Sequence, residues 1–173
     1  MDLKKLIREI PDFPQPGISF KDISTVLKDA DAFRHIIVTL ADYYRSYRPE
    51  LVVGVESRGY ILGAPLAYEL RCGFVLVRKP GKLPAKTERI DYSLEYGENS
   101  LEIHVDAITP GQKVLIVDDI LATGGTISAT AELVKRLGGN IIGYAFLAEL
   151  DDLMGREKLP KDVPVFSLIH YKE

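Results

Sequence analysis

Val114-Leu-Ile-Val-Asp-Asp-Ile-Leu-Ala-Thr-Gly-Gly-Thr126 opens with four large apolar residues in a row. Such a run predicts a strand that is buried on both faces. Two acids and a glycine-containing turn follow, and apolar residues then recur at helical spacing until Gly138-Gly139 stops the helix. The stretch therefore predicts a strand, an acidic pair, a tight turn and the start of a helix.

The turn after the acids, Ala122–Thr126, suits a phosphate group. Backbone N–H groups at the start of a helix lack intrahelical partners and attract anions. Thr123 and Thr126 add hydroxyl donors, while Gly124 and Gly125 let the backbone approach an anion and adopt a positive φ where needed. The turn is not a Walker loop, because no Gly-Lys-Ser/Thr follows, and it lacks the G-x-G-x-x-G pattern of dinucleotide-binding turns.

Asp118 and Asp119 need a different ligand, because carboxylates beside a phosphate do not help to bind it. Consecutive strand residues point to opposite faces, so both acids can serve one ligand only if the strand ends between them. Carboxylates accept hydrogen bonds from vicinal diols and from metal-bound water. Phosphate donors beside diol acceptors describe a ribose 5-phosphate; the alternative is a strand with a solvated acidic end, followed by a capped helix.

Length and composition predict one ordinary globular domain. The chain has 173 residues, of which 46% are hydrophobic and 27% charged, and its net charge of −3 argues against bulk nucleic-acid binding. One cysteine excludes an internal disulfide framework, and His35, His104 and His170 form no zinc-like pair. With neither a signal peptide nor an apolar run of transmembrane length, we expect a cytoplasmic protein.

Strands alternate with helices along the chain. Apolar runs predict strands at 51–55, 73–77, 113–118 and 141–147, and a final edge strand at 163–168. Amphipathic spacing predicts helices at 3–10 and 32–47. We therefore expect an α/β fold with a parallel twisted sheet flanked by helices, and a ligand beyond the carboxyl ends of its strands.

Three further segments carry residues suited to binding. Glu56-Ser57-Arg58-Gly59 ends one strand and begins a helix, and residues 78–89 hold five basic residues and one acid, which invites an anion. Prolines and glycine indicate a mobile lid at about 80–89, attached to a hairpin at 91–105. Residues 13–23, with two prolines and a glycine, predict a stiff irregular loop. Taken alone, these segments are also compatible with a plain turn, a solvated basic loop and a surface loop.

Residues 114–126 resemble the phosphoribosyl-diphosphate motif of type I phosphoribosyltransferases, and nearly the whole chain resembles the adenine phosphoribosyltransferases of that family. The stretches that carry the second likeness are FPQPGISFKDI at 13–23, ESRG at 56–59, RKPGKLP at 78–84, YSLEYG at 92–97 and GREKL at 155–159. The resemblance implies the type I phosphoribosyltransferase fold, as one domain over 1–173. It also implies a small hood at about 1–28 and an antiparallel flexible-loop arm at about 80–105.

The resemblance implies a purine site. Phe20 would stack on the base, the backbone from Ser19 to Lys21 would read its 6-amino group and N7, and Leu150 would lie nearby. Glu95 would act as general acid or base, and Tyr96 would cover the reacting centre. A 6-oxo purine would place an acceptor against an acceptor, at a cost of about 1–3 kcal/mol for each unpaired group.

The resemblance also implies a donor site. Ala122, Thr123, Gly124, Gly125 and Thr126 would hold the 5-phosphate, and Asp118 and Asp119 would hold the ribose hydroxyls and water on Mg²⁺, without ligating the metal directly. Cationic side chains and amides would hold the leaving diphosphate: Ser57, Arg58, Gly59, Arg78, Lys79 and Lys82. With Glu95, the acids and Arg58 would form the catalytic set, and a cis or strained peptide is expected near Glu56-Ser57.

The implied activity is transfer of the 5-phosphoribosyl group from 5-phosphoribosyl 1-diphosphate to adenine, giving AMP and diphosphate in purine salvage, with Mg²⁺ as cofactor. A homodimer is implied, without nucleic-acid or membrane partners. Alternatives are a phosphoribosyltransferase for another base, a binding module without turnover, and a non-catalytic regulator. About ten residues precede the hood loop, too few for the DNA-binding segment expected of such a regulator.

Overall fold

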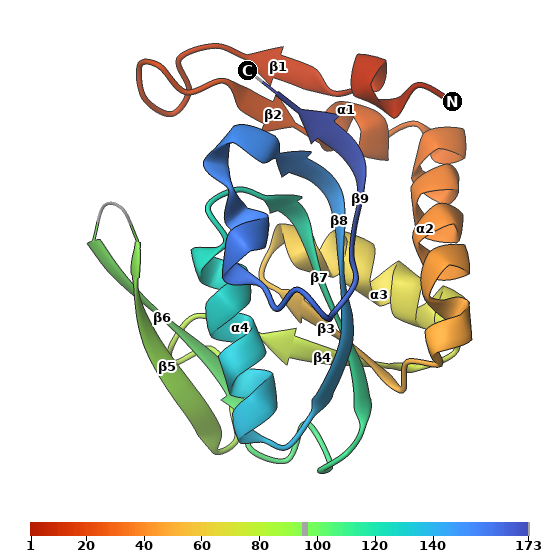
Figure 1. The fold of residues 1–173 in the computed structure, drawn as a ribbon. Coiled ribbons are helices and arrows are strands. Elements are labelled where there is room, and N and C mark those ends of the chain that lie inside the picture. The colour runs from red at the N-terminus through yellow and green to blue at the C-terminus, as the bar shows by residue number, and fades with distance from the viewer. Residues whose placement is uncertain (95–96, 173) are drawn as a thin grey trace.

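A five-stranded parallel sheet forms the centre of the computed structural model, which describes residues 1–94 and 97–172. Its strand order is β4-β3-β7-β8-β9 (Figure 1). These strands are β3 (Leu51–Val55), β4 (Gly73–Val77), β7 (Lys113–Leu121), β8 (Asn140–Leu150) and β9 (Val165–Tyr171). The predicted α/β fold is confirmed, and β9 is an edge strand as expected.

Helices cover both faces of this sheet (Figure 1). They are α1 (Ser24–Leu27), α2 (Ala30–Tyr44), α3 (Arg58–Leu70) and α4 (Gly125–Arg136). The core under α2 and α3 includes Val52 and Leu115, whereas the core under α4 includes Val53 and Ile116. Neighbouring strand residues therefore enter opposite cores, which explains why β3 and residues 114–117 of β7 are unbroken apolar runs.

Two antiparallel ribbons flank the sheet. The first pairs β1 (Arg8–Ile10) with β2 (Phe20–Asp22) and lies across the carboxyl ends of β8 and β9 (Figure 1). The second pairs β5 (Thr87–Leu94) with β6 (Gly97–His104) and stands beside α4. The hairpin predicted after the basic loop is confirmed.

Several local predictions differ from the structure. Residues 3–10, predicted as one helix, form a 3₁₀ segment, Leu3–Leu6, and then β1, because Ile10 pairs with Phe20 of β2. The loop predicted at 13–23 contains a cis Phe13–Pro14 bond but ends in strand β2. The helix predicted to reach residue 47 stops at Tyr44, and a 3₁₀ segment, Arg45–Tyr47, follows.

Helix α2 illustrates how local and long-range contacts agree. The Asp29 carboxylate caps the helix by accepting a hydrogen bond from the Ala32 N–H at 2.9 Å. Ile36, Leu40 and Tyr44 are buried at helical spacing, and the Tyr44 hydroxyl donates to the Tyr144 carbonyl of β8 at 2.5 Å. Within the described residues, none of the helices has both the length and the apolar character needed to cross a membrane.

Candidate active site

The predicted site residues meet beyond the carboxyl ends of β3 and β7. A cavity of about 190 Å³ lies there, and its lining includes Arg58, Asp118, Asp119 and the turn Ala122–Thr126. This is where a parallel α/β sheet places its ligands. The structure therefore brings the acidic pair, the arginine and the glycine-containing turn together.

The turn ends in the first residues of α4. Gly124 precedes the helix with a φ of +84°, and no side chain among the described residues caps the helix. Helix geometry leaves the N–H groups of Gly125 and Thr126 without intrahelical acceptors. The turn thus offers backbone donors and the positive end of the α4 dipole to an anion in the cavity.

The acidic pair lies inside β7. The strand continues to Leu121, so the expectation that it must end between the two acids is wrong. Both carboxylates still line the cavity, because β3 pairs with β7 only as far as Val117 and leaves that edge open. Asp118 accepts a hydrogen bond from the Asp119 N–H at 2.9 Å, while Asp119 Oδ2 lies 3.0 Å from Arg58 Nε.

Burial governs the charge of this pair. Asp118 keeps some accessible surface but lies among densely packed atoms. Burial raises its pKa well above the ordinary value, and the negative charge of Asp119 raises it further. The Arg58–Asp119 contact lacks hydrogen-bond geometry, so Asp119 Oδ2 is buried without a hydrogen-bond partner among the described residues. An orphaned carboxylate oxygen of this kind suits a donor from a ligand or from metal-bound water.

Arg58 connects the acids with the N-terminal ribbon. Its guanidinium carbon lies 5.5 Å from the centre of the Phe20 ring, which itself contacts Phe13 edge-on at 5.2 Å. Gly59 allows α3 to approach the acids, since an added Cβ would lie 3.0 Å from Asp118 Oδ1. The expected cis peptide is present at Glu56–Ser57. The hood aromatic, the ESRG turn and the acidic pair are therefore contiguous.

Glu56 is a residue of this site whose role was not predicted. Its carboxylate accepts a hydrogen bond from Arg78 Nε at 2.8 Å and another from the Lys79 N–H at 3.1 Å. Burial raises the Glu56 pKa, but these two donors outweigh burial and leave the pKa below its ordinary value. Glu56 thereby holds the start of the basic loop against the ESRG turn. The sequence signalled the residue through its place in the ESRG stretch at the end of a strand, but not its contacts with Arg78 and Lys79.

Side chains of the hood residues hold the ribbon together. Lys21 is buried, with Nζ 2.9 Å from Glu9 Oε2, 3.0 Å from Ser19 Oγ and 4.4 Å from the centre of the Tyr171 ring. A two-stranded ribbon pairs only one edge of each strand, so alternate backbone groups of β2 remain open to a ligand. This is compatible with base recognition by the backbone at 19–21.

Other predicted residues are less constrained. Leu150 ends β8 and is half-buried, whereas Lys79 and Lys82 are exposed on the loop after β4. The Lys82 carbonyl lies 3.4 Å from Arg78 Nη1. Glu95 and Tyr96 lie outside the described residues, so their predicted roles have no structural counterpart here.

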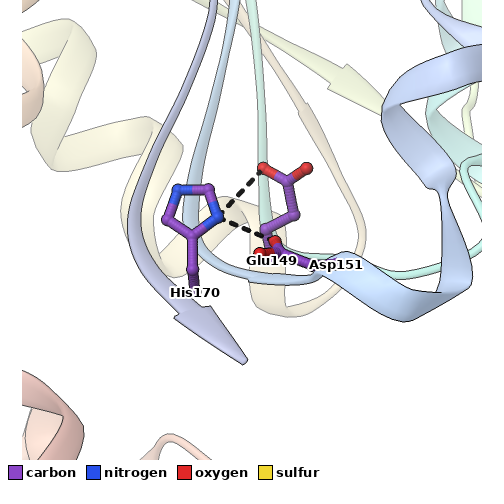
Figure 2. Close-up of side chains that lie close together, drawn as sticks. All are labelled: Glu149, Asp151 and His170. Atoms are coloured by element: carbon purple, nitrogen blue, oxygen red, sulfur yellow. Dashed lines mark hydrogen bonds and ion pairs between the residues drawn. The ribbon is translucent and has the colours of Figure 1, made fainter. Parts of the chain in front are cut away.

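A second cluster lies at the ends of β8 and β9 (Figure 2). His170 Nδ1 is 2.8 Å from Asp151 Oδ1 and 3.9 Å from Glu149 Oε2, and these ligand-type atoms lie within 4.8 Å of one another. However, Arg156 already donates to both Glu149 oxygens, at 2.9 and 2.6 Å. A guanidinium in this position neutralises the carboxylate and repels a cation. The cluster therefore fits an ion-pair network better than a metal centre.

Residues 22–171 match the model of the phosphoribosyl transferase domain. The adenine phosphoribosyltransferase of Geobacter metallireducens is 59% identical over 170 residues, which cover 98% of this chain and 99% of that protein. The adenine phosphoribosyltransferase of a Synechococcus strain is 57% identical over 171 residues, which cover 99% of each.

Solved structures of adenine phosphoribosyltransferases also superpose on this chain. The crystal structure of adenine phosphoribosyltransferase from Thermoanaerobacter pseudethanolicus superposes with a TM-score of 0.94 at 55% identity, over 98% of both chains. The Saccharomyces cerevisiae adenine phosphoribosyltransferase, complexed with adenine and an imino-altritol bisphosphate, superposes with a TM-score of 0.90 at 42% identity, over 96% of both chains.

Proposed function

The chain belongs to the phosphoribosyltransferase family, in its adenine phosphoribosyltransferase branch, and we propose that its chemistry takes place in the cavity between Arg58, the acidic pair and Ala122–Thr126. The reaction transfers the 5-phosphoribosyl group from 5-phosphoribosyl 1-diphosphate to adenine and yields AMP and diphosphate, a step of purine salvage. One observation carries this location: the two acids and the start of α4, which no side chain of the described residues caps, line the same cavity.

The donor's sugar phosphate would occupy the centre of the cavity. The N–H groups and hydroxyls of Ala122–Thr126 would bind the 5-phosphate, a role supported by the αL conformation of Gly124 at the start of α4. Asp118 and Asp119 would accept hydrogen bonds from the two ribose hydroxyls. The unsatisfied Asp119 oxygen supports this role, because a diol would supply the missing donor.

The leaving diphosphate would lie between the ESRG turn and the basic loop. Arg58 and the amides of Ser57 and Gly59 would approach from one side, and Arg78, Lys79 and Lys82 would approach from the other. The Glu56 contacts support this arrangement, because they hold Arg78 and Lys79 beside the turn. Positioned cations favour the developing negative charge of the leaving group.

Magnesium is the proposed cofactor. Two carboxylates beside a phosphate site suit a hydrated Mg²⁺, which keeps several of its waters and binds phosphate oxygens. Asp118 and Asp119 would accept hydrogen bonds from those waters and would not ligate the ion. When bound, Mg²⁺ supplies positive charge beside the diphosphate.

Adenine would bind under the hood. Phe20 would stack on the ring, the backbone from Ser19 to Lys21 would recognise the 6-amino group and N7, and Leu150 would pack beside it. The contact between Phe20 and Arg58 supports this position, because it puts the aromatic ring next to the donor site. Glu95 and Tyr96, outside the described residues, would complete the site from the arm.

The proposed step is a substitution at C1 of the ribose. The bond from C1 to the diphosphate oxygen breaks, and its electron pair leaves with the diphosphate. The electron pair of the adenine N9–H bond forms the new C1–N9 bond from the opposite face, and the N9 proton passes to a general base, for which Glu95 is the proposed residue. Most of the rate would come from positioning and from charge stabilisation.

An assay of AMP formation tests the location. Wild-type protein with adenine, donor and MgCl₂ should form AMP, and Asp118→Asn combined with Asp119→Asn should lower the rate about a hundredfold or more. Asp42→Asn, at an exposed position of α2, is the matched control and should keep the wild-type rate. A double variant with an unchanged rate would exclude the acids from the site.

The same assay tests the base. Hypoxanthine or guanine should react about fivefold to a hundredfold more slowly than adenine, since one unpaired buried acceptor costs about 1–3 kcal/mol. Equal rates with a 6-oxo purine would contradict recognition of the 6-amino group by the hood backbone.

We also propose that the chain forms a homodimer and that its single domain carries a hood and an arm. A homodimer is supported by apolar residues exposed on α3 and on the adjacent edge strand β4. The hood at about 1–28 and the arm at about 80–105 would be the parts of the single domain that close over the ligands.

A further inference from the structure

The GREKL stretch at 155–159 matches the family pattern, yet no step of the proposed reaction uses it. In the structure it begins a 3₁₀ segment, Gly155–Lys158, that lies against the back of the phosphate turn. A Cβ added to Gly155 would lie 2.2 Å from the Ala122 carbonyl oxygen, and one added to Gly124 would lie 2.6 Å from the Gly155 carbonyl oxygen. The two backbones therefore touch directly, with no side chain between them.

Arg156 fastens this segment to the sheet. Its Nε and Nη2 donate to the two oxygens of Glu149 at 2.9 and 2.6 Å, and its Nη1 donates to the Val165 carbonyl at 3.1 Å. Ser167 Oγ donates to Glu149 Oε2 at 2.8 Å, so the buried carboxylate is fully engaged. In the sheet, Glu149 pairs with Leu121, the residue just before the turn. The Arg156–Glu149 pair, called the clamp below, therefore lies beside the turn Ala122–Thr126.

A second contact holds the other end of the connection. β8 ends at Leu150, the residue proposed to lie near the base, and the next residue, Asp151, contacts His170 of β9 at 2.8 Å (Figure 2). Only four residues separate Leu150 from Gly155. A short connection, attached at Asp151 and at Arg156, thus runs from the base side of the site to the phosphate side.

We propose that Arg156 is a positioning residue: through its bidentate pair with Glu149 it holds Gly155 against Ala122 and Gly124 and so orients the N–H groups that bind the 5-phosphate. This rests on the proposed role of Ala122–Thr126. Displacement of a binding group by about 1 Å can cost up to about a hundredfold in rate or affinity. Loss of the clamp should therefore weaken ligands that carry the 5-phosphate more than it weakens adenine.

Three changes test the proposal from different directions. Arg156→Gln combined with Glu149→Gln removes the pair without leaving a buried charge unpaired. Gly155→Ala leaves the pair intact but forces the turn away from the added methyl group. Arg156→Lys keeps the charge but loses the bidentate geometry. The matched control is Arg45→Gln, because Arg45 forms surface ion pairs with Asp42 and Glu69.

The measurements are KM for the donor, KM for adenine, kcat, the Kd of AMP by calorimetry and the Tm of each full-length variant. The double variant and Gly155→Ala should raise the donor KM and the AMP Kd about tenfold or more, and the adenine KM less than threefold. The donor KM and the AMP Kd of Arg156→Lys should lie between those of these variants and those of the wild type. Arg45→Gln should leave all constants unchanged.

A purely structural role would lower Tm while the donor KM and the AMP Kd of the folded variants stayed within twofold of the wild type, and this result would overturn the proposal. Equal rises in the constants of adenine and of AMP would overturn it too. If Gly155→Ala does not fold, the double variant and Arg156→Lys still give the result. Wild-type protein that forms no AMP would instead refute the proposed function.

Discussion

The carboxyl group of Asp118 has opposite effects on folding and on ligand binding. Burial first, and the charge of Asp119 second, raise its pKa well above 3.8. Above pH 4, the folded protein therefore retains a proton that the unfolded chain has already lost. In that range, up to the raised pKa, the free energy of unfolding falls as pH rises, by up to about 1.4 kcal/mol per pH unit.

Asp118→Asn should remove this slope. In the wild type the Asp119 N–H donates to the Asp118 carboxylate at 2.9 Å. Asparagine keeps a side-chain oxygen that can accept this hydrogen bond, but it carries no charge to desolvate. Urea unfolding of the ligand-free protein should show the variant to be more stable than the wild type at pH 7, with the difference shrinking towards pH 4. AMP formation should fall in the same variant. A variant that is less stable at pH 7 would contradict burial as the cause of the raised pKa.

Individual site residues differ in how much the sequence revealed. The acids and the glycine-containing turn were predicted, because they are adjacent in sequence and follow a strand. The contact of Arg58 with both Phe20 and Asp119 joins three segments, so no local spacing could indicate it. Glu149 offered a usable signal, since an acid within an apolar strand requires a buried partner.

Among the elements, the strands of the central sheet were easier to predict than the hood. β3, β7 and β8 are largely buried strands whose residues feed two cores, and that burial shows directly as apolar sequence; the edge strand β4 contributes Val75 and Val77 to one core. β1 has only three residues and its burial is slight, so the apolar spacing of 3–10 matched a helix equally well. Pairing with β2 outweighs that local preference. The sequence of a short segment does not show which other segment it will pair with.

The packing of α2 on β8 gives a stability prediction for these two elements. The register of β8 against β7 shifts near Gly143, and a Cβ added there would lie 2.2 Å from the buried Tyr44 ring. Gly143→Ala should therefore lower the free energy of unfolding by about 1–3 kcal/mol, as overpacking does. Urea titration measures this, and folded Gly143→Ala should keep the wild-type KM values because the site is not involved.

A double-mutant cycle identifies the cause. Tyr44→Leu alone should destabilise the protein, since it removes the hydrogen bond to the Tyr144 carbonyl and leaves space. Combined with Gly143→Ala, it makes room for the added methyl group, so the two losses should sum to more than the loss in the double variant. Strictly additive losses would show that the Tyr44 ring is not what limits residue 143.

In the whole molecule, the ligand site and the proposed dimer contact lie at different parts of the sheet. The hood lies over the carboxyl ends of β8 and β9, and the arm stands beside α4, so both border the proposed site (Figure 1). The β4 edge, at the other end of the sheet from β9, exposes apolar side chains together with α3: Tyr68 is 86% exposed, and Ile61 and Leu76 are each 40% exposed. A second copy covering this edge would bury these side chains and leave the hood, over β8 and β9, uncovered.

Tyr68→Glu tests this arrangement, because a charge at the centre of an apolar contact opposes its desolvation. Sedimentation velocity over a range of concentrations should give a dimer for the wild type and a shift towards monomer for the variant. Tyr47→Glu is the matched control: Tyr47 is 41% exposed but stacks with Tyr43, whose ring stacks on Phe166 of β9, the strand at the other end of the sheet from β4, so its dimer should persist. A monomeric wild type would contradict the homodimer. Dissociation by Tyr47→Glu alone would instead place the interface on the α2 side, because only a contact centred there would be broken by that charge.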